Sequence, residues 1–247
     1  MDDTLLDAVE MGLQWRRDGF VVVRGLFSPS RAAQLADHME TIVNQWRECD
    51  HGGSGAAPAN PGAASSIVHP LHAGYFSEGG VSRRRVRLLE AAADERVLRL
   101  GQAILGDRPC FRSLQYMINP TETSMDGNWH RDAPLQSVPV APVPTPDEEG
   151  LLRENTEGGG GSGGCVQLQI ALLPSDDVEL VRGSHLVWDT PEQWHVRLAD
   201  NKAHCRPPGS DHMPRAERIA LRPGDALAFN PFGTHRLPRF PMNIKSA

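Results

Sequence analysis

Residues 218–236 read RIALRPGDALAFNPFGTHR, and this stretch decides which fold the sequence predicts. Two short apolar runs, RIAL and DALAF, are separated by Arg222, Pro223 and Gly224, residue types typical of a tight turn. The second run leads into NPFGTHR, which places His235 ten residues after Asp225. Short apolar runs separated by turn residues predict strands of an antiparallel barrel or sandwich.

Similar short apolar runs occur elsewhere in the C-terminal half. Residues 110–118 (CFRSLQYMI) and 165–173 (CVQLQIALL) are also short apolar or alternating runs. We therefore expect the second half of the chain to be rich in β-structure.

The first half has a different, helical pattern. Apolar residues at helical spacing predict an amphipathic helix over residues 3–17, on the positions Leu5, Leu6, Val9 and Leu13. Residues 20–23 (FVVV) predict a short strand, and Ser28-Pro29 predicts the start of a helix. A further helical region is expected from about residue 84 to 105. Together these patterns predict one domain over residues 1–247, mainly β with flanking helices, in which the helical N-terminal half supports the β-rich half.

Two segments are expected to be flexible loops or lids. Residues 51–66 contain only His, Gly, Ser, Ala, Pro and Asn, which cannot build a core. The loop is expected to run over residues 51–80. Residues 139–164 combine Pro-rich, charged and Gly-rich pieces and interrupt the β-rich half.

The overall composition excludes several classes of protein. The chain has 247 residues, 39% hydrophobic, with a net charge of −6, so attraction of its whole surface to nucleic acid or anionic lipid is not expected. No run approaches the roughly 20 apolar residues of a membrane span. The first residues, MDDTLLDAVE, lack the pattern of a signal peptide. The four scattered cysteines form no CxxC pair, so we expect reduced thiols and a cytoplasmic location.

The segment NWHRDAP, residues 128–134, carries the candidate chemistry. Side chains two apart in a strand share a face, so His130 and Asp132 could bind one metal ion together. With His235 far along the chain, they match a triad of two histidines and one carboxylate. Such a triad occupies one face of Fe(II) and leaves positions for a bidentate cosubstrate and O₂.

Three motifs in order, NWHRDAP, VRGSHLVWDTPEQ and LRPGDALAFNPFGTHR, resemble the phytanoyl-CoA dioxygenase family. The resemblance implies a double-stranded β-helix (jelly-roll) core and an oxygenase that uses Fe(II), 2-oxoglutarate and O₂. It implies that His130, Asp132 and His235 are the metal ligands. It also implies hydroxylation with release of succinate and CO₂, because relatives that halogenate lack the carboxylate corresponding to Asp132.

One feature departs from the family pattern. The family usually carries an Arg about ten residues after the distal His, which grips the far carboxylate of 2-oxoglutarate. Here position 245 is Lys, which is a point charge rather than a planar fork. The cosubstrate is expected to contact some of five residues: Gln115, Asn119, Gln169, Arg239 and Lys245. Trp129 and His185 are candidate substrate contacts, with a core aromatic and a hydrogen-bonded turn histidine as the respective alternatives.

Two functions therefore remain open. The first is a dioxygenase that hydroxylates a small or medium organic molecule. The second is a non-catalytic jelly-roll protein that binds a metal or small ligand, impaired by an altered C-terminal strand. The family name does not make the substrate a CoA thioester. The sequence predicts no oligomeric state.

Overall fold

Strands of three antiparallel sheets form the centre of the molecule. The computed structural model describes residues 8–49, 67–71, 83–106, 109–111, 114–118, 129–132, 143–157, 165–203 and 212–236. The first sheet has the order β1-β7-β4, with strands Phe20–Val23, Ala226–Phe229 and Gln167–Ile170. The second has the order β6-β5-β8, with strands Ala216–Leu221, Ser175–Val181 and His235–Arg236. The third pairs β2 (Ile67–Leu71) with β3 (Leu114–Ile118).

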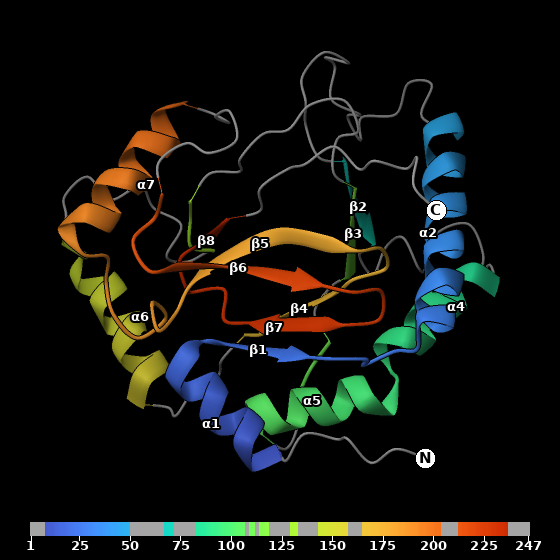
Figure 1. Ribbon diagram of the computed structural model, residues 1–247, viewed down its shortest axis with the longest axis horizontal. Coiled ribbons are helices and arrows are strands. Elements are labelled where there is room, and N and C mark those ends of the chain that lie inside the picture. Colours follow the sequence, from blue (N-terminus) through green and yellow to red (C-terminus); the bar gives the residue numbers. More distant parts are fainter. Residues whose placement is uncertain are drawn as a thin grey trace.

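The first two sheets enclose the main hydrophobic core (Figure 1). Alternate side chains of β1 and β7, namely Phe20, Leu227 and Phe229, lie in one buried cluster with residues of β5 and β6. This follows from the period of two along a strand, which sends every second side chain to the same face. The mixed sheet-and-helix class expected from the sequence is confirmed.

Helices α1 (Ala8–Asp18) and α5 (Glu95–Leu105) cover the outer face of the β1-β7-β4 sheet. Trp15 of α1 and Leu100 of α5 pack with Val21 and Ala228, which point away from the main core. The prediction that Val9 and Leu13 lie on the buried face of the first helix is wrong. Val9 and Leu13 are exposed, because α5 and the sheet bury the face that carries Met11 and Trp15.

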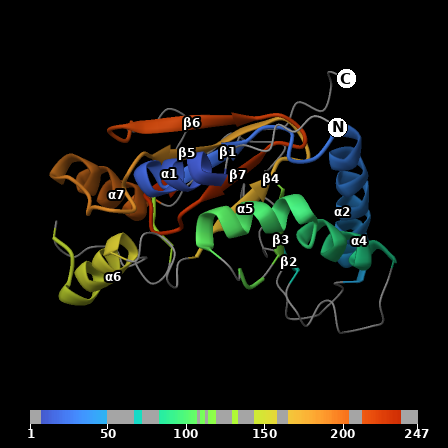
Figure 2. The ribbon, with the colours of Figure 1, turned by 90° about the horizontal axis from the view of Figure 1, so that it is seen from below.

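Two further helices lie at one end of the sheets, α2 (Pro29–Cys49) and α4 (Arg83–Ala92) (Figure 2). The Ser28 Oγ accepts a hydrogen bond from the backbone N–H of Arg31, so the predicted start of α2 at Ser28-Pro29 is confirmed. The single helical region expected over residues 84–105 is two helices. The first ends at Ala92, and Asp94 caps α5 by accepting a hydrogen bond from the Arg96 N–H.

Helices α6 (Pro146–Glu157) and α7 (Pro191–Ala203) lie at the opposite end (Figures 1 and 2). The segment 139–164, expected to be a flexible loop or lid, contains the helix α6. Thr145 and Glu148 form reciprocal side-chain-to-backbone hydrogen bonds, a capping box that stabilises the first turn. Thr190 and Gln193 form the same box at the start of α7. Within the expected loop of residues 51–80, residues 67–71 form β2.

A tight contact joins α1 to the turn after β5. Gly19, between α1 and β1, has a φ of +80°, and a Cβ placed there would lie 2.4 Å from Nδ1 of His185. Only glycine fits both the backbone and the neighbouring imidazole. Among the described helices, none combines the length and apolar character needed to cross a bilayer.

Candidate metal centre

Three side chains from distant parts of the sequence converge at one end of the two main sheets. His130, Asp132 and His235 each offer one ligand atom, and these atoms all lie within 4.8 Å of one another. The His130 Nε2 lies 3.7 Å from Oδ1 of Asp132, and the His235 Nε2 lies 3.9 Å from Oδ2. The three residues predicted as metal ligands are therefore brought together by the fold.

Backbone hydrogen bonds hold the two ligand-bearing segments side by side. The N–H of His130 donates to the carbonyl of His235, and the N–H of His235 donates back, both at 2.9 Å. Asp132 adds a third bond, from its N–H to the Pro231 carbonyl at 2.8 Å. The two imidazole rings consequently lie with their centroids 4.3 Å apart.

The Nε2 atom of the His235 imidazole faces the site. The Nδ1 of this ring lies 2.9 Å from the Gly233 carbonyl, and because a carbonyl only accepts, Nδ1 carries the proton. The lone pair is then on Nε2, which faces Asp132. The side chain is buried, and burial lowers the pKa of His235 to about 3. A neutral imidazole held through Nδ1–H is the usual state of a metal-binding histidine.

Asp132 is oriented by an amide on the neighbouring sheet. The Gln167 Nε2 in β4 donates a hydrogen bond to Oδ2 of Asp132. Burial raises the pKa of the Asp132 carboxyl, while His130 and the Gln167 hydrogen bond act against that shift. Gln167 pairs in register with Phe229 of β7, whose ring centroid lies 5.0 Å from that of His235. The first sheet therefore lines one side of the site.

A model of the phytanoyl-CoA dioxygenase (PhyH) family matches residues 15–236. The chain belongs to this family. No curated protein matches the sequence significantly.

Several solved structures have a similar fold. AviO1 from Streptomyces viridochromogenes has a TM-score of 0.60 at 17% identity, covering 96% of this chain and 90% of that one. The epimerase SnoN, solved with Fe³⁺, α-ketoglutarate and nogalamycin RO, has a TM-score of 0.57 at 16% identity, covering 96% and 78%. HygX from Streptomyces hygroscopicus, with nickel and 2-oxoglutarate bound, has a TM-score of 0.56 at 14% identity, covering 93% and 80%. At these identities the likeness is one of fold.

In this phytanoyl-CoA dioxygenase family member, the expected cosubstrate residues are placed only in part. Gln169 lies two positions from Gln167 in β4, so both side chains share the face of the strand that carries the Asp132 contact. Gln115 belongs to β3, and its side chain lies outside the described part of the structure. Asn119, Arg239 and Lys245 also lie outside the described residues.

The two residues expected to touch substrate are buried in the protein instead. Trp129 packs with Val181 and Met213, and the Arg236 guanidinium lies 4.6 Å from the centroid of its ring. His185 lies against Gly19, and burial lowers its pKa to about 4, partly offset by a hydrogen bond with the Arg16 backbone. These contacts give both side chains a structural environment rather than a place in an open site.

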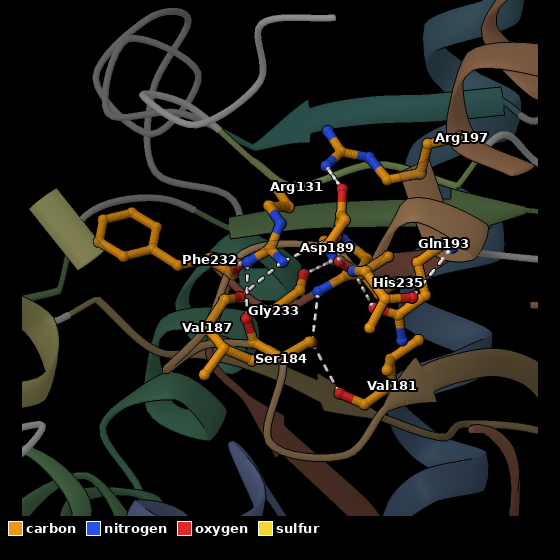
Figure 3. A network of polar contacts seen from close by, with 12 residues as sticks. Arg131, Val181, Ser184, Val187, Asp189, Gln193, Arg197, Phe232, Gly233 and His235 are labelled. Carbon is orange, nitrogen blue, oxygen red and sulfur yellow. Dashed lines mark hydrogen bonds and ion pairs between the residues drawn. The ribbon is translucent and has the colours of Figure 1, made fainter. Parts of the chain in front are cut away.

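A buried polar network that sequence reasoning missed lies beside His235 (Figure 3). Its centre is Arg131, which stands between His130 and Asp132 and is completely buried. The Arg131 guanidinium is paired with Asp189, which also pairs with Arg197 of α7. The sequence did contain a signal for the burial of Arg131. If His130 and Asp132 share one face of a strand, the residue between them points to the opposite, inner face. A charged residue there requires an acidic partner.

Proposed function

We propose that this chain is an Fe(II)- and 2-oxoglutarate-dependent oxygenase that hydroxylates a small or medium organic molecule. The observation that carries the proposal is the convergence of His130, Asp132 and His235 within 4.8 Å. Two imidazoles and one carboxylate form the donor set suited to a non-haem Fe(II) site with open positions. We also propose the double-stranded β-helix as the architecture, which the family match and the two facing three-stranded sheets support.

The described residues fit such a metal ion. His235 has its Nδ1 proton engaged by Gly233 and its Nε2 lone pair toward the site. Gln167 occupies one oxygen of Asp132, which leaves the other as the single carboxylate donor. When bound, the iron would supply the activation of O₂, coupled to oxidation of 2-oxoglutarate to succinate and CO₂.

The chain's own contribution is to hold and orient the reactants. Gln169 and Phe229 extend from the metal ligands along the first sheet and offer a polar contact and an apolar wall for the cosubstrate. Gln115, Asn119, Arg239 and Lys245 remain proposed cosubstrate contacts. SnoN and HygX were solved with nogalamycin RO and hygromycin B bound, respectively, which supports an organic small molecule as the substrate class.

Succinate formation tests the proposal. Purified protein is given Fe(II) and 2-oxoglutarate in air, and succinate is measured in the wild type, His130→Ala and Asp132→Ala. We expect turnover in the wild type and in neither ligand variant. A matched control is His195→Ala, because this histidine is exposed on α7. Equal succinate formation by the wild type and both ligand variants would refute the proposal.

The identity of the reaction is a separate question, because SnoN is an epimerase. Mass spectrometry of the product distinguishes the outcomes once a substrate is found. Hydroxylation adds one oxygen atom to the substrate, whereas epimerisation leaves its mass unchanged.

The second candidate is a jelly-roll protein that binds a metal or ligand without turnover. It is favoured by Lys245, which stands where the family pattern has an Arg. Anaerobic visible spectroscopy with Fe(II) separates the two candidates. A weak charge-transfer band that requires 2-oxoglutarate supports the oxygenase, and bound Fe(II) without that band supports the second candidate.

A further inference from the structure

The side chain of Arg131 points away from the ligands between which it stands. It has no exposed surface, and its Nη1 donates to the carbonyls of Ser184 and Phe232, both at 2.6 Å. Its Nη2 donates to the Val187 carbonyl at 3.0 Å and to Oδ1 of Asp189 at 2.9 Å. One guanidinium thus binds four acceptors.

These acceptors come from two separate parts of the chain. Ser184, Val187 and Asp189 lie in the segment between β5 and α7. Phe232 lies in the turn that leads from β7 to His235. Arg131 therefore joins the segment of His130 and Asp132 to the turn that sets the position of His235.

A second layer of bonds secures Asp189 and the same turn. The Thr234 Oγ1 donates to Oδ1 of Asp189 at 3.0 Å, and Arg197 pairs with the other oxygen. The backbone N–H of Thr234 donates to Oγ of Ser184 at 2.7 Å. Thr234 directly precedes His235, and both its backbone N–H and its hydroxyl are bonded to residues of the network that holds Arg131.

The backbone pairing alone is too short to fix the site rigidly. His130 and His235 form an isolated bridge outside the longer ladders, and β8 has two residues. A buried ion pair gives little stability over a well-packed apolar pair, so stability alone does not account for this one. A planar fork with several fixed acceptors does, however, define a geometry.

We propose that Arg131, held by Asp189, is a positioning residue that sets the arrangement of the three metal-ligand atoms. The inference rests on the proposed metal centre and deepens it. Outer partners of this kind change metal affinity without touching the metal. Lysine in place of Arg131 keeps the charge but loses the fork, so it separates geometry from charge.

The test is metal binding by the full-length apo-protein, with Co(II) as the probe. Dissociation constants and Co(II) visible spectra are measured for the wild type, Arg131→Lys and Thr234→Val. We expect Arg131→Lys to weaken Co(II) binding at least about tenfold and to change the Co(II) spectrum, as losses of outer partners do. Thr234→Val, which removes one donor to Asp189 at nearly constant shape, should produce a smaller change in the same direction.

The control is Asp225→Asn, which alters another buried carboxylate. Asp225 accepts hydrogen bonds from Arg24, Gly25 and Arg222 and touches none of the ligands in the described structure. It should lower the melting temperature but leave the Co(II) spectrum and affinity unchanged.

Each outcome bears on the proposal. If the wild type binds Co(II) and neither Arg131→Lys nor Thr234→Val changes affinity or spectrum, the positioning role is refuted while the metal centre stands. If Arg131→Lys does not fold, Thr234→Val decides. A change of equal size in Asp225→Asn would refute it by showing general loosening. A wild type that binds no Co(II) overturns the metal centre and this inference with it.

Discussion

The four residues 129–132 present two faces of different character. On one face, the side chains of His130 and Asp132 are 38% and 25% exposed and lie among the metal-ligand atoms. On the other, Trp129 and Arg131 are 2% and 0% exposed. Alternation along an extended backbone produces both faces from adjacent residues.

The two faces therefore have different proposed roles: the first carries candidate metal ligands, and the second positions them. The side chains of His130 and Asp132 on the ligand face are partly exposed, so they contribute little to the buried core. The inner face packs on Val181 and Met213, and its Arg131 donates hydrogen bonds to three backbone carbonyls from two other segments. Substitutions on the two faces should therefore affect different measurements.

The largest effect is expected on the ligand face. His130→Ala and Asp132→Ala should reduce metal-dependent turnover by more than about 100-fold, beyond the loss typical of outer partners. Because both side chains are partly exposed, the melting temperature of the apo-protein should change little. Steady-state succinate assays and thermal unfolding measure the two quantities. Strong loss of stability in either variant would contradict the separation of the faces.

On the inner face, Trp129→Ala should mainly lower the stability of the protein. It leaves a cavity beside Val181 and Met213 and removes the ring that Arg236 covers, so the free energy of unfolding should fall by about 3–5 kcal/mol. Urea unfolding of the apo-protein measures this loss. Trp129→Phe is the conservative control and should lose less. An unchanged unfolding midpoint in Trp129→Ala would show that the inner face is not structural.

A fall in pH should lower the free energy of unfolding through the buried histidine His185. Because burial lowers the pKa of His185 to about 4, below the ordinary value near 6.5, the unfolded chain binds this proton more readily than the folded one. The stabilisation is complete above about pH 6.5 and falls as the pH drops toward 4, by about 3 kcal/mol for this group. His235 acts in the same direction.

Urea unfolding of the apo-protein across this pH range tests the expectation. The His185→Gln variant should show a shallower dependence of unfolding free energy on pH than the wild type. Parallel curves for the two proteins would contradict the assignment to His185.

The smallest effect is expected at Gln167. Replacing it with Leu removes the donor to Oδ2 of Asp132, so metal affinity should weaken by about tenfold, at the low end for an outer partner that is itself exposed. Gln169→Leu, two positions along the same strand, is the matched control for the change of side chain. Calorimetric titration with Mn(II) compares them. Equal Mn(II) affinity of the wild type and Gln167→Leu would assign no orienting role to the amide.

Local signals in the sequence predicted much of the fold. The run FVVV forms β1, and Ser28-Pro29 begins α2 as expected. The buried face of α1 was predicted wrongly, because Val9 and Leu13 have helical spacing just as Met11 and Trp15 do. Which face is buried depends on α5, a partner that periodicity within α1 does not reveal.

At the candidate site, too, features with a local sequence pattern were predicted, whereas a contact between distant residues was not. The spacing of His130 and Asp132, the position of His235 just past a strand and the three ordered family motifs together named the side chains that converge. Arg131 and Asp189 were missed as a pair because 58 positions separate them. Sequence spacing shows that Arg131 needs a partner, but only the folded chain shows which carboxylate is near.

The contact between Gly19 and His185 limits how this scaffold can be redesigned. A side chain at position 19 would collide with the imidazole, so a bulkier residue there demands a smaller one at position 185. Exchange of the N-terminal helix with that of a relative would succeed only if the segment around residue 185 came from the same donor. The two segments would therefore have to be exchanged together, although more than 150 residues of chain lie between them.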